Sequence, residues 1–421
     1  MGIVTESDFS AAAFTDGSVA SIGIRFSRYQ AEARACWLTF PASPLRIAPQ
    51  IRASTAEALP ADLLHNWQQV ENGETSYAQR SLVTAQLTDI ALRLCDRTLS
   101  DVAETADEVL VAGICGAGVW NGDANLRSYT ELIDSARLTE QFGMTVIDNL
   151  PGRDIAQGGQ GGPMEAHGLS MLLADRTPVP GHRWRALADV SPHVSTVTVI
   201  GPPRQWGQAG TFMTGNAGVG SRLLSELKLT YKDAIGDRPL VELADAGQII
   251  PELNELWCAT TGPNTQWQPE GINALSLRYA LQSSEYANSP IEHLIATAYH
   301  HLAFQIARYV QYQVPKMSPV GELFLMGEGC DEALNERLEQ LLTAIPIRRL
   351  AEIGQDRTIH AAAVAVLTLL HVWQIPVPCT NGGETPRVPG RINPGSPSNW
   401  RRVLSTMTSN APWLMPLREA I

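Results

Sequence analysis

Short runs of β-branched and apolar residues alternate with helical patterns along this chain, and this alternation is the feature that most constrains its fold. Four such runs lie at 109–113, 144–147, 196–201 and 323–327. Each has the length and composition of a buried strand that ends in a turn. Strands that alternate with helices predict an α/β protein. The length of 421 residues allows two to three domains at about 150 residues each.

The clearest helical pattern begins at Ser289. Pro290 suits the first helical position, and Glu292 is placed to complete a capping box with Ser289. One helical face is then apolar: Ile291, Leu294, Ile295, Ala298, Leu302, Ile306 and Tyr309. The apolar segment 361–373 is shorter than the roughly 20 residues of a membrane span, so it predicts a buried helix.

Two further segments have distinct patterns. A strand from Leu323, a turn at 327–329 and a helix from Asp331 form a predicted strand–turn–helix unit. From Pro376 to Pro397 the chain is rich in Pro, Gly, Asn and Ser, which predicts an irregular crossing and no helix.

Composition excludes several classes of function. Lys and Arg number 31 against 43 Asp and Glu, a net charge of −12 without any basic run, which argues against a duplex DNA binder. The six cysteines form no CxxC pair, which excludes a zinc ribbon, and indicate reduced thiols. The first ten residues lack the pattern of a signal peptide. We therefore expect a cytoplasmic protein that handles small molecules, with no nucleic-acid or membrane partner.

The segment Asp148–Pro163, DNLPGRDIAQGGQGGP, has five glycines in sixteen residues. Glycines cluster where the backbone approaches a ligand or adopts positive φ. Asp154 precedes the Gly-Gly pair by four residues and is either a turn or cap residue or a site carboxylate. Arg153 beside it is either an ion-pair partner or a ligand of the substrate.

This segment resembles the Arg-Asp-x-Ala-x-Gly-Gly-Gln-Gly-Ala-Pro stretch of the anhydro-N-acetylmuramic acid kinase family. The preceding residues 145–149 are similar to the family's Val-Val-x-Asp-Phe-Arg run. Residues 14–18 stand where the family begins with Gly-Thr-Ser-x-Asp-Gly, and 380–383 followed by 390–392 stand where it ends in glycine-rich turns. The resemblance covers most of the chain and is strongest around Asp154.

The resemblance implies a two-lobed sugar-kinase/actin-type ATPase fold of the ribonuclease H-like kind. The expected lobes are 1–125 plus 385–421, and 126–384. It implies ATP-dependent conversion of 1,6-anhydro-N-acetylmuramic acid and water to the 6-phosphate sugar in peptidoglycan turnover. Asp154 would be the general base that activates water. ATP and Mg²⁺ are implied as cofactors, and no residue is assigned as a metal ligand.

The resemblance also implies which residues bind each substrate. The sugar side comprises Arg153, Gly158, Gly159, Gln160, Gly161, Trp120 and His360. The nucleotide side comprises Asp16, Gly17, Ser18, Thr214, Gly215, Asn216, Gly218, Gly327 and Gly329. For His360 a second interpretation stays open, a histidine satisfied at the start of a helix.

The chain departs from the family in its loops. Phe14 replaces a small residue of the first phosphate loop, Met213 replaces an acidic residue near Mg²⁺, and Glu328 lies in the adenine-side turn. The loop 115–119 lacks the His and Gln of a family Gly-His-Gly-Gln-Thr segment. Three hypotheses follow: the family's kinase, a non-catalytic relative that binds a sugar or partner, and a kinase for another sugar. A homodimer is also expected, with the 289–312 helix as its candidate contact.

Overall fold

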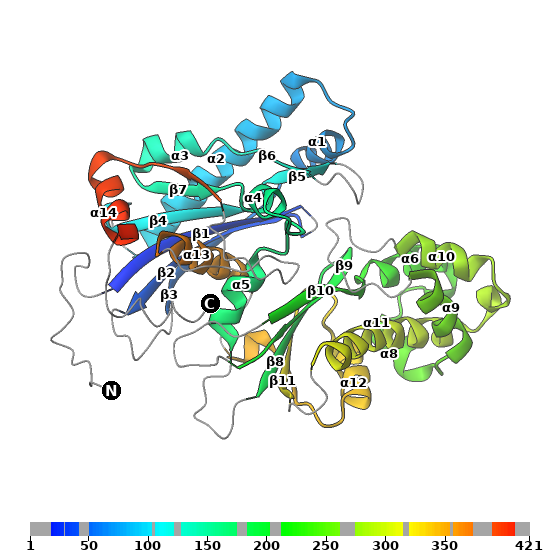
Figure 1. The fold of residues 1–421 in the computed structure, drawn as a ribbon. Coiled ribbons are helices and arrows are strands. Elements are labelled where there is room, and N and C mark those ends of the chain that lie inside the picture. Colours follow the sequence, from blue (N-terminus) through cyan, green and yellow to red (C-terminus); the bar gives the residue numbers. More distant parts are fainter. Residues whose placement is uncertain are drawn as a thin grey trace. The chain divides into compact units, whose positions relative to one another are not determined.

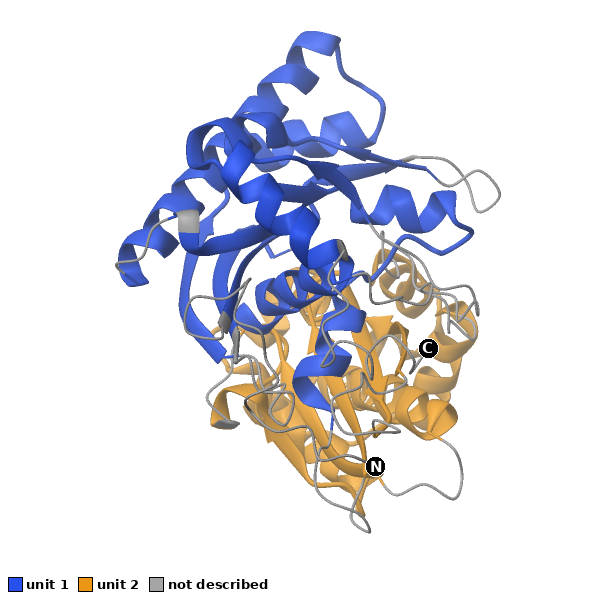
Figure 2. Cartoon of the chain, turned by 60° about the vertical axis from the view of Figure 1, so that its left-hand side comes forward, with its two compact units in different colours: residues 1–174, 203–210, 358–421 blue, residues 175–202, 211–357 orange. Residues whose placement is uncertain are grey.

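The computed structural model describes residues 18–28, 30–41, 50–102, 106–121, 128–174, 183–202, 212–261, 274–314, 320–353, 357–373 and 390–408. Figure 1 shows the chain. It divides into two compact units, which Figure 2 colours separately. Unit 1 comprises 1–174, 203–210 and 358–421, and unit 2 comprises 175–202 and 211–357.

Unit 1 is built on a six-stranded sheet of order β13-β7-β4-β1-β2-β3. The strands are β1 (Ser18–Ser27), β2 (Glu32–Pro41), β3 (Gln50–Ala58), β4 (Val109–Cys115), β7 (Thr145–Asp148) and β13 (Arg391–Asn393). The first three form an antiparallel meander, whereas β4 runs parallel to β1 and β7 parallel to β4. A separate two-stranded ribbon joins β5 (Gly118–Asn121) to β6 (Ser128–Glu131).

Helices cover both faces of this sheet. They are α1 (Ala61–Glu71), α2 (Tyr77–Val102), α3 (Ser135–Phe142), α4 (Leu150–Ala156), α5 (Glu165–Leu173), α13 (Thr358–Val372) and α14 (Pro397–Thr408), with the 3-10 turn η3 (Ala106–Glu108). All fifteen residues of α13 are buried, which confirms the buried helix predicted at 361–373. Gly23 lets α13 lie against the sheet, because a Cβ there would be 1.9 Å from the Ala361 carbonyl oxygen.

Unit 2 is built on a five-stranded sheet of order β10-β9-β8-β11-β12. The strands are β8 (Trp184–Val190), β9 (Val194–Ile200), β10 (Phe212–Val219), β11 (Val320–Met326) and β12 (Ile347–Arg349). Its helical elements are α6 (Arg222–Thr230), α7 (Lys232–Ile235), α8 (Leu240–Ala246), α9 (Pro251–Thr261), α10 (Ala274–Gln282), η4 (Glu285–Asn288), α11 (Ile291–Gln313), α12 (Glu332–Leu341) and η5 (Leu350–Ile353).

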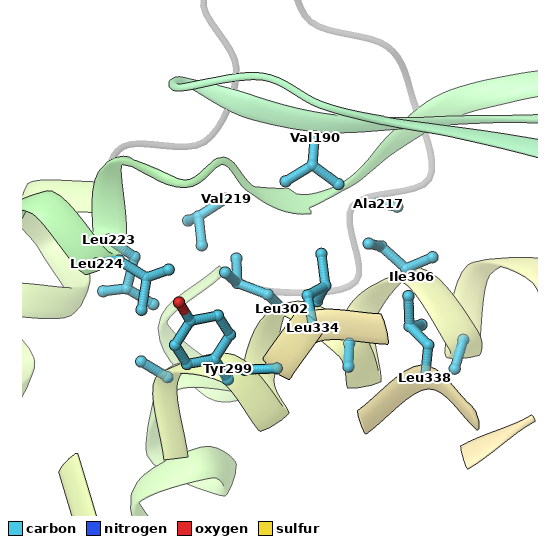
Figure 3. Close-up of a cluster of buried hydrophobic side chains, with 14 of the residues drawn as sticks. Val190, Ala217, Val219, Leu223, Leu224, Tyr299, Leu302, Ile306, Leu334 and Leu338 are labelled. Carbon is cyan, nitrogen blue, oxygen red and sulfur yellow. The ribbon is translucent and has the colours of Figure 1, made fainter. Parts of the chain in front are cut away.

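The core of unit 2 lies between its sheet and α11 (Figure 3). The apolar face predicted for this helix is buried throughout, from Ile291 to Tyr309, whereas Tyr312 is exposed. The predicted capping box is wrong. Ser289 ends the preceding turn η4, and α11 begins after Pro290 without a side-chain cap.

Both sheets share one topology. In each, a three-stranded antiparallel meander is extended from its first strand by two parallel strands. This is the ribonuclease H-like arrangement of the sugar-kinase/actin-type fold, and it confirms the predicted fold class. The repeat is one of topology, since no repeat of fixed period exists in the sequence.

The four predicted strands are confirmed as β4, β7, β9 and β11. The predicted irregular crossing from Pro376 to Pro397 needs correction, because 391–393 form strand β13 on the edge of the unit 1 sheet. The segment 380–383 lies outside the described residues.

The boundaries of the two compact units differ from those of the lobes expected from the sequence. Residues 126–174 and 358–384 fall in unit 1. The reason is tertiary: β7 pairs with β4, and α13 packs on β1 and β4. No helix in the described part of the chain has both the length and the apolar run that a membrane crossing requires.

Candidate active site

Asp154 lies in the last turn of a short helix, α4, that the sequence did not predict inside the glycine-rich segment. Strand β7 ends at Asp148, and Asn149 then adopts a positive φ of 52° before the helix begins. The side chain of Asn149 folds over Gly152, where a Cβ would be 2.3 Å from the Asn149 Oδ1. Asp154 itself is 6% exposed, so this helix holds the predicted catalytic carboxylate almost completely buried.

The glycines that follow wrap around the Asp154 carboxylate. The Gly161 N–H donates to Asp154 Oδ2 at 2.7 Å. A Cβ on Gly159 would lie 2.0 Å from the same oxygen. Gly158 and Gly161 have φ of +86° and +79°, a region that favours glycine. The glycines therefore allow the backbone to approach the Asp154 carboxylate closely. From the sequence, this close approach was expected to be toward a bound ligand.

Trp120 belongs to the same cluster. Its ring lies against Gly161, where a Cβ would be 2.4 Å from the Trp120 Cη2. Tyr129, on the neighbouring strand β6, packs against this ring with 5.0 Å between centroids. The structure thus brings Trp120 and Gly161 together with Asp154, while the sugar-binding role of the first two and the catalytic role of Asp154 stay predictions. Whether Arg153, Gln160 and the glycines bind sugar stays a prediction.

A partly buried ion pair, close enough to His360 to feel its charge, was missed at the sequence level. Arg25 Nε donates to Glu165 Oε1 at 2.6 Å, and Glu165 is 8% exposed. Burial pushes the pKa of Glu165 upward, but the charges of Arg25 and His360 outweigh it and hold this pKa below its ordinary value. The available signal was the position of Glu165, a carboxylate two residues after the glycine-rich segment.

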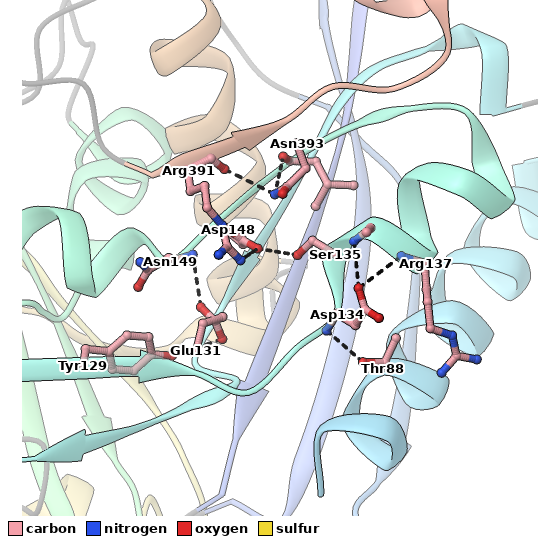
Figure 4. Close-up of polar contacts among 12 residues, drawn as sticks. Thr88, Tyr129, Glu131, Asp134, Ser135, Arg137, Asp148, Asn149, Arg391 and Asn393 are labelled. Atoms are coloured by element: carbon pink, nitrogen blue, oxygen red, sulfur yellow. Dashed lines mark hydrogen bonds and ion pairs between the residues drawn. The ribbon is translucent and has the colours of Figure 1, made fainter. Parts of the chain in front are cut away.

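A second polar cluster lies at the start of α4 (Figure 4). The fully buried Asp148 carboxylate accepts two hydrogen bonds from Arg391, at 2.9 and 2.7 Å, and one from Ser135. Glu131 accepts the Asn149 N–H at 3.1 Å. Burial, and next the charge of Asp148, raise the pKa of Glu131 to about 8.

In unit 2 the carboxyl ends of β8, β10 and β11 lie at one edge of the sheet, since these three strands run in the same direction. The predicted phosphate loop needs correction here. Thr214, Gly215 and Asn216 are residues of strand β10, and Thr214 pairs with Thr198 of β9.

Met213 is also a residue of β10, and its side chain packs against the core of unit 2. The turn from strand to helix comes later, at Gly220 and Ser221, because β10 continues to Val219 before α6 begins. The Gly218-Val219-Gly220 spacing was the signal for this turn. Gly218 lies at a β-bulge with φ of +145°.

Three turns pack against one another at this edge. A Cβ on Gly327 would be 2.4 Å from the Val190 carbonyl oxygen, and one on Gly329 would be 2.8 Å from the Ser221 Cβ. The Gly220 position is equally tight against Ser191 of the turn after β8, at 2.1 Å. Small residues therefore let the three strand ends pack closely, and glycine-rich turns at strand ends are a common setting for phosphate.

The Glu328 carboxylate in the turn after β11 is paired with Arg357 at 3.3 Å, within unit 2. This ion pair balances the charge that Glu328 brings to the adenine-side turn. The departure from the family at this position therefore adds no net charge to the turn.

The same edge offers oxygen ligands of the kind that Mg²⁺ prefers. Asp189, at the end of β8, is 8% exposed, and Asn216 is fully buried. No group of three or more His, Cys, Asp and Glu side chains suited to a metal exists among the described residues. Mg²⁺ usually takes one or two protein carboxylates, with water and phosphate completing its shell, and Asp189 offers one carboxylate of this kind. Asp189 was missed because a single strand-end aspartate is a common pattern.

The predicted first phosphate loop falls almost entirely outside the described residues. Phe14, Asp16 and Gly17 lie outside the described residues, and Ser18 is the first residue of β1. Thr214, Gly215, Asn216, Gly218, Gly327 and Gly329 remain predicted nucleotide ligands.

Comparison with known proteins identifies one family. A family model described as anhydro-N-acetylmuramic acid kinase matches residues 47–395, most of the chain. No curated protein matches the chain. Among solved structures, a xylulose kinase of Lactobacillus acidophilus is 7% identical, with 95% of this chain and 98% of that one covered and a TM-score of 0.42.

Two other solved structures are similarly distant. A gluconate kinase of Lactobacillus acidophilus is 7% identical, with 96% and 98% covered and a TM-score of 0.39. Component A of the (R)-2-hydroxyglutaryl-CoA dehydratase of Acidaminococcus fermentans is 11% identical, with 83% and 96% covered and a TM-score of 0.40. Likenesses this distant do not bear on activity.

Proposed function

Because this chain belongs to the anhydro-N-acetylmuramic acid kinase family and is a sugar kinase, we propose that it hydrolyses and phosphorylates 1,6-anhydro-N-acetylmuramic acid. It would use ATP and Mg²⁺, in the cytoplasm, as a step of peptidoglycan turnover. The observation that supports this most is the setting of Asp154, buried and held by the Gly161 N–H at 2.7 Å. A carboxylate fixed in this way is pre-oriented for proton transfer.

In the proposed reaction Asp154 takes a proton from water as the water oxygen attacks the anomeric carbon of the sugar. The bond between that carbon and O6 breaks, and O6 accepts the γ-phosphoryl group of ATP. The products are ADP and the 6-phosphate sugar. A positioned general base contributes about 10²–10⁴-fold to such a step.

For the nucleotide, we propose that the backbone at Gly218, Gly220 and the turn 327–329 receives phosphate. Asp189 and Asn216 would hold Mg²⁺, whose charge offsets that of the transferring phosphoryl group. The close packing of the three turns supports this role, because it brings the ends of β8, β10 and β11 to one place in unit 2.

The test is product formation by the purified chain with ATP, Mg²⁺ and the anhydro sugar. We expect a 6-phosphate sugar that carries one oxygen from isotopically labelled water, read by mass spectrometry. Asp154→Asn should lower kcat by about 10²-fold or more. The matched control is Asp134→Asn, since Asp134 is an exposed cap of α3 that asparagine also caps. Equal activity of the two variants would contradict the role of Asp154.

A kinase for another sugar is the second candidate, and the loop after β4 favours it. Cys115, Ala117 and Val119 are all buried there, so the loop presents no polar side chain in place of the family's His and Gln. Phosphorylation of another sugar in a substrate panel, without turnover of the anhydro sugar, would select this candidate. Binding of sugar without any turnover would select the non-catalytic relative.

A further inference from the structure

Glu131 is the last residue of β6, outside the glycine-rich segment and without any motif of its own. Its two carboxylate oxygens contact different elements. Oε2 accepts from the Asn149 backbone, and Oε1 accepts from the Tyr129 hydroxyl. Figure 4 shows Glu131 between Asn149 and Tyr129. Each contact leads to Asp154 by a separate route.

The first route runs through the start of α4. The Asn149 N–H donates to Glu131 Oε2 at 3.1 Å, and the Asn149 carbonyl accepts the first helical hydrogen bond, from the Arg153 N–H at 3.1 Å. Asn149 is the residue with positive φ that turns the chain from β7 into the helix. Holding its N–H therefore sets the direction in which α4 leaves the sheet, and with it the position of Asp154 one turn later.

The second route runs through two aromatic rings. The Tyr129 hydroxyl donates to Glu131 Oε1 at 3.4 Å, and the Tyr129 ring packs on Trp120. Trp120 in turn lies against Gly161, whose N–H donates to Asp154 Oδ2. Both routes connect Glu131 with Asp154. The first passes through the start of α4, and the second passes through the glycine loop at Gly161.

The surroundings of Glu131 explain how a carboxyl group can accept the hydrogen bond of the Asn149 backbone. Asp148 is the charged neighbour, itself paired with Arg391, while Tyr129 and the buried Cys115 thiol are the other titratable groups nearby. Burial and the Asp148 charge raise the pKa of Glu131 to about 8, which favours the neutral acid. A neutral acid accepts the Asn149 N–H as an amide oxygen would.

We propose that Glu131 is a positioning residue, which fixes the Asp154 carboxylate by holding the start of α4 and the Trp120–Gly161 contact at once. The proposal rests on the role of Asp154 in the proposed function. It adds a residue that touches neither sugar nor nucleotide in that scheme.

The test compares Glu131→Ala, Glu131→Gln and Tyr129→Phe in the full chain. The control is Thr88→Val, which removes a buried hydroxyl that accepts the Asp134 N–H at 3.0 Å and lies on neither route. Two readouts are used: kcat with KM for ATP, and hydrogen–deuterium exchange of the peptide spanning 150–163. Exchange requires no turnover, so it remains informative if the proposed substrate is wrong.

We expect Glu131→Ala to lower kcat by about 10- to 100-fold with KM for ATP unchanged, as a small misplacement of a catalytic group does. Exchange at 150–163 should rise in parallel. Glu131→Gln should retain most of kcat at pH 7, because its amide still accepts the Asn149 N–H. Tyr129→Phe should cost about fivefold, the worth of one hydrogen bond, and it tests the proposal if Glu131→Ala fails to fold.

Three outcomes would overturn the proposal. The first is unchanged hydrogen–deuterium exchange at 150–163 in both Tyr129→Phe and Glu131→Ala. The second is a loss of kcat in Glu131→Gln as large as that in Glu131→Ala. The third is a loss of kcat in the control Thr88→Val as large as that in Glu131→Ala. Absence of turnover by the wild-type chain would instead reject the proposed function, and exchange would still decide the positioning role.

Discussion

At the scale of single residues, the candidate site depends on the lack of a side chain at Gly159 as much as on the Asp154 carboxylate. The space beside Oδ2 is filled by backbone, since a Cβ at Gly159 would lie 2.0 Å from that oxygen. Close packing of this kind restricts the carboxylate, and the Gly161 N–H donates to the same oxygen. Small changes in the glycines should therefore act on Asp154 and leave the rest of unit 1 in place.

Gly159→Ala should lower kcat by about 10²-fold, because the added methyl group displaces the carboxylate from the position the Gly161 N–H gives it. The matched control is Gly73→Ala, where φ is +73° and no atom lies within 4 Å of the added Cβ. That variant carries backbone strain without any contact to the site. Steady-state kinetics and thermal unfolding measure both, and a similar kcat in the two variants would contradict the prediction.

Glu131 makes stability depend on pH in a defined direction. Its folded pKa is raised from 4.5 to about 8, by burial first and by Asp148 next. A raised pKa in the folded state gives stability that is complete below the unfolded pKa and is lost as pH rises through the folded one. Glu131→Gln has no such loss. Its Tm relative to wild type should therefore increase from pH 5 to pH 8 and level off above, and an offset that stays constant from pH 5 to 9 would argue against the shift.

At the scale of elements, unit 1 is organised by how closely α13 approaches its sheet. The hydroxyl of Ser21 on β1 bonds the Val111 carbonyl at 3.0 Å and lies 3.2 Å from the Thr368 hydroxyl of α13. Gly23 and Gly113 on the same face leave room for the helix backbone and for Thr368. A helix whose whole surface is buried gains its stability from this packing and not from amphipathic character.

Gly23→Ala should destabilise the chain by about 1–3 kcal/mol, the usual cost of overpacking a core. The Ala361 carbonyl oxygen, 1.9 Å from the added Cβ, is helix backbone and cannot move aside alone. Ser54→Ala, at an exposed position of β3, is the control. Urea unfolding gives both free energies, and a loss no larger than that of Ser54→Ala would mean that α13 can shift at little cost.

At the scale of the whole molecule, one topology occurs twice, and the two units place different chemistry on it. Unit 1 carries the buried carboxylate and its aromatic neighbours, whereas unit 2 carries the packed turns with Asp189 and Asn216. Each sheet supplies carboxyl ends of parallel strands, where side chains and turns from distant segments meet. Ligand effects should therefore separate by unit.

ATP with Mg²⁺ should raise the Tm of wild type and of Asp154→Asn alike, by the equivalent of about 2.7 kcal/mol at 100 times Kd. Asp189→Asn should lose the Mg²⁺-dependent part of this shift, because an amide holds a hard cation less well than a carboxylate. Asp237→Asn, at an exposed site of unit 2, serves as the control. A full Mg²⁺-dependent shift in Asp189→Asn would exclude Asp189 from the metal site.

The sequence by itself determined what depends on neighbours along the chain. Helical spacing identified the buried face of α11, an unbroken apolar run identified α13, and the glycine-rich segment singled out Asp154 as a candidate. Only the tertiary structure decided which distant residues meet. Arg391 contacts Asp148 because β13 pairs with β7. Asn149 turns the chain from β7 into helix α4, which the sequence did not predict. Glu131 lies on a strand without a motif and accepts the Asn149 N–H. Periodicity and propensity are local properties, whereas strand pairing across hundreds of residues follows from the packing of the whole core.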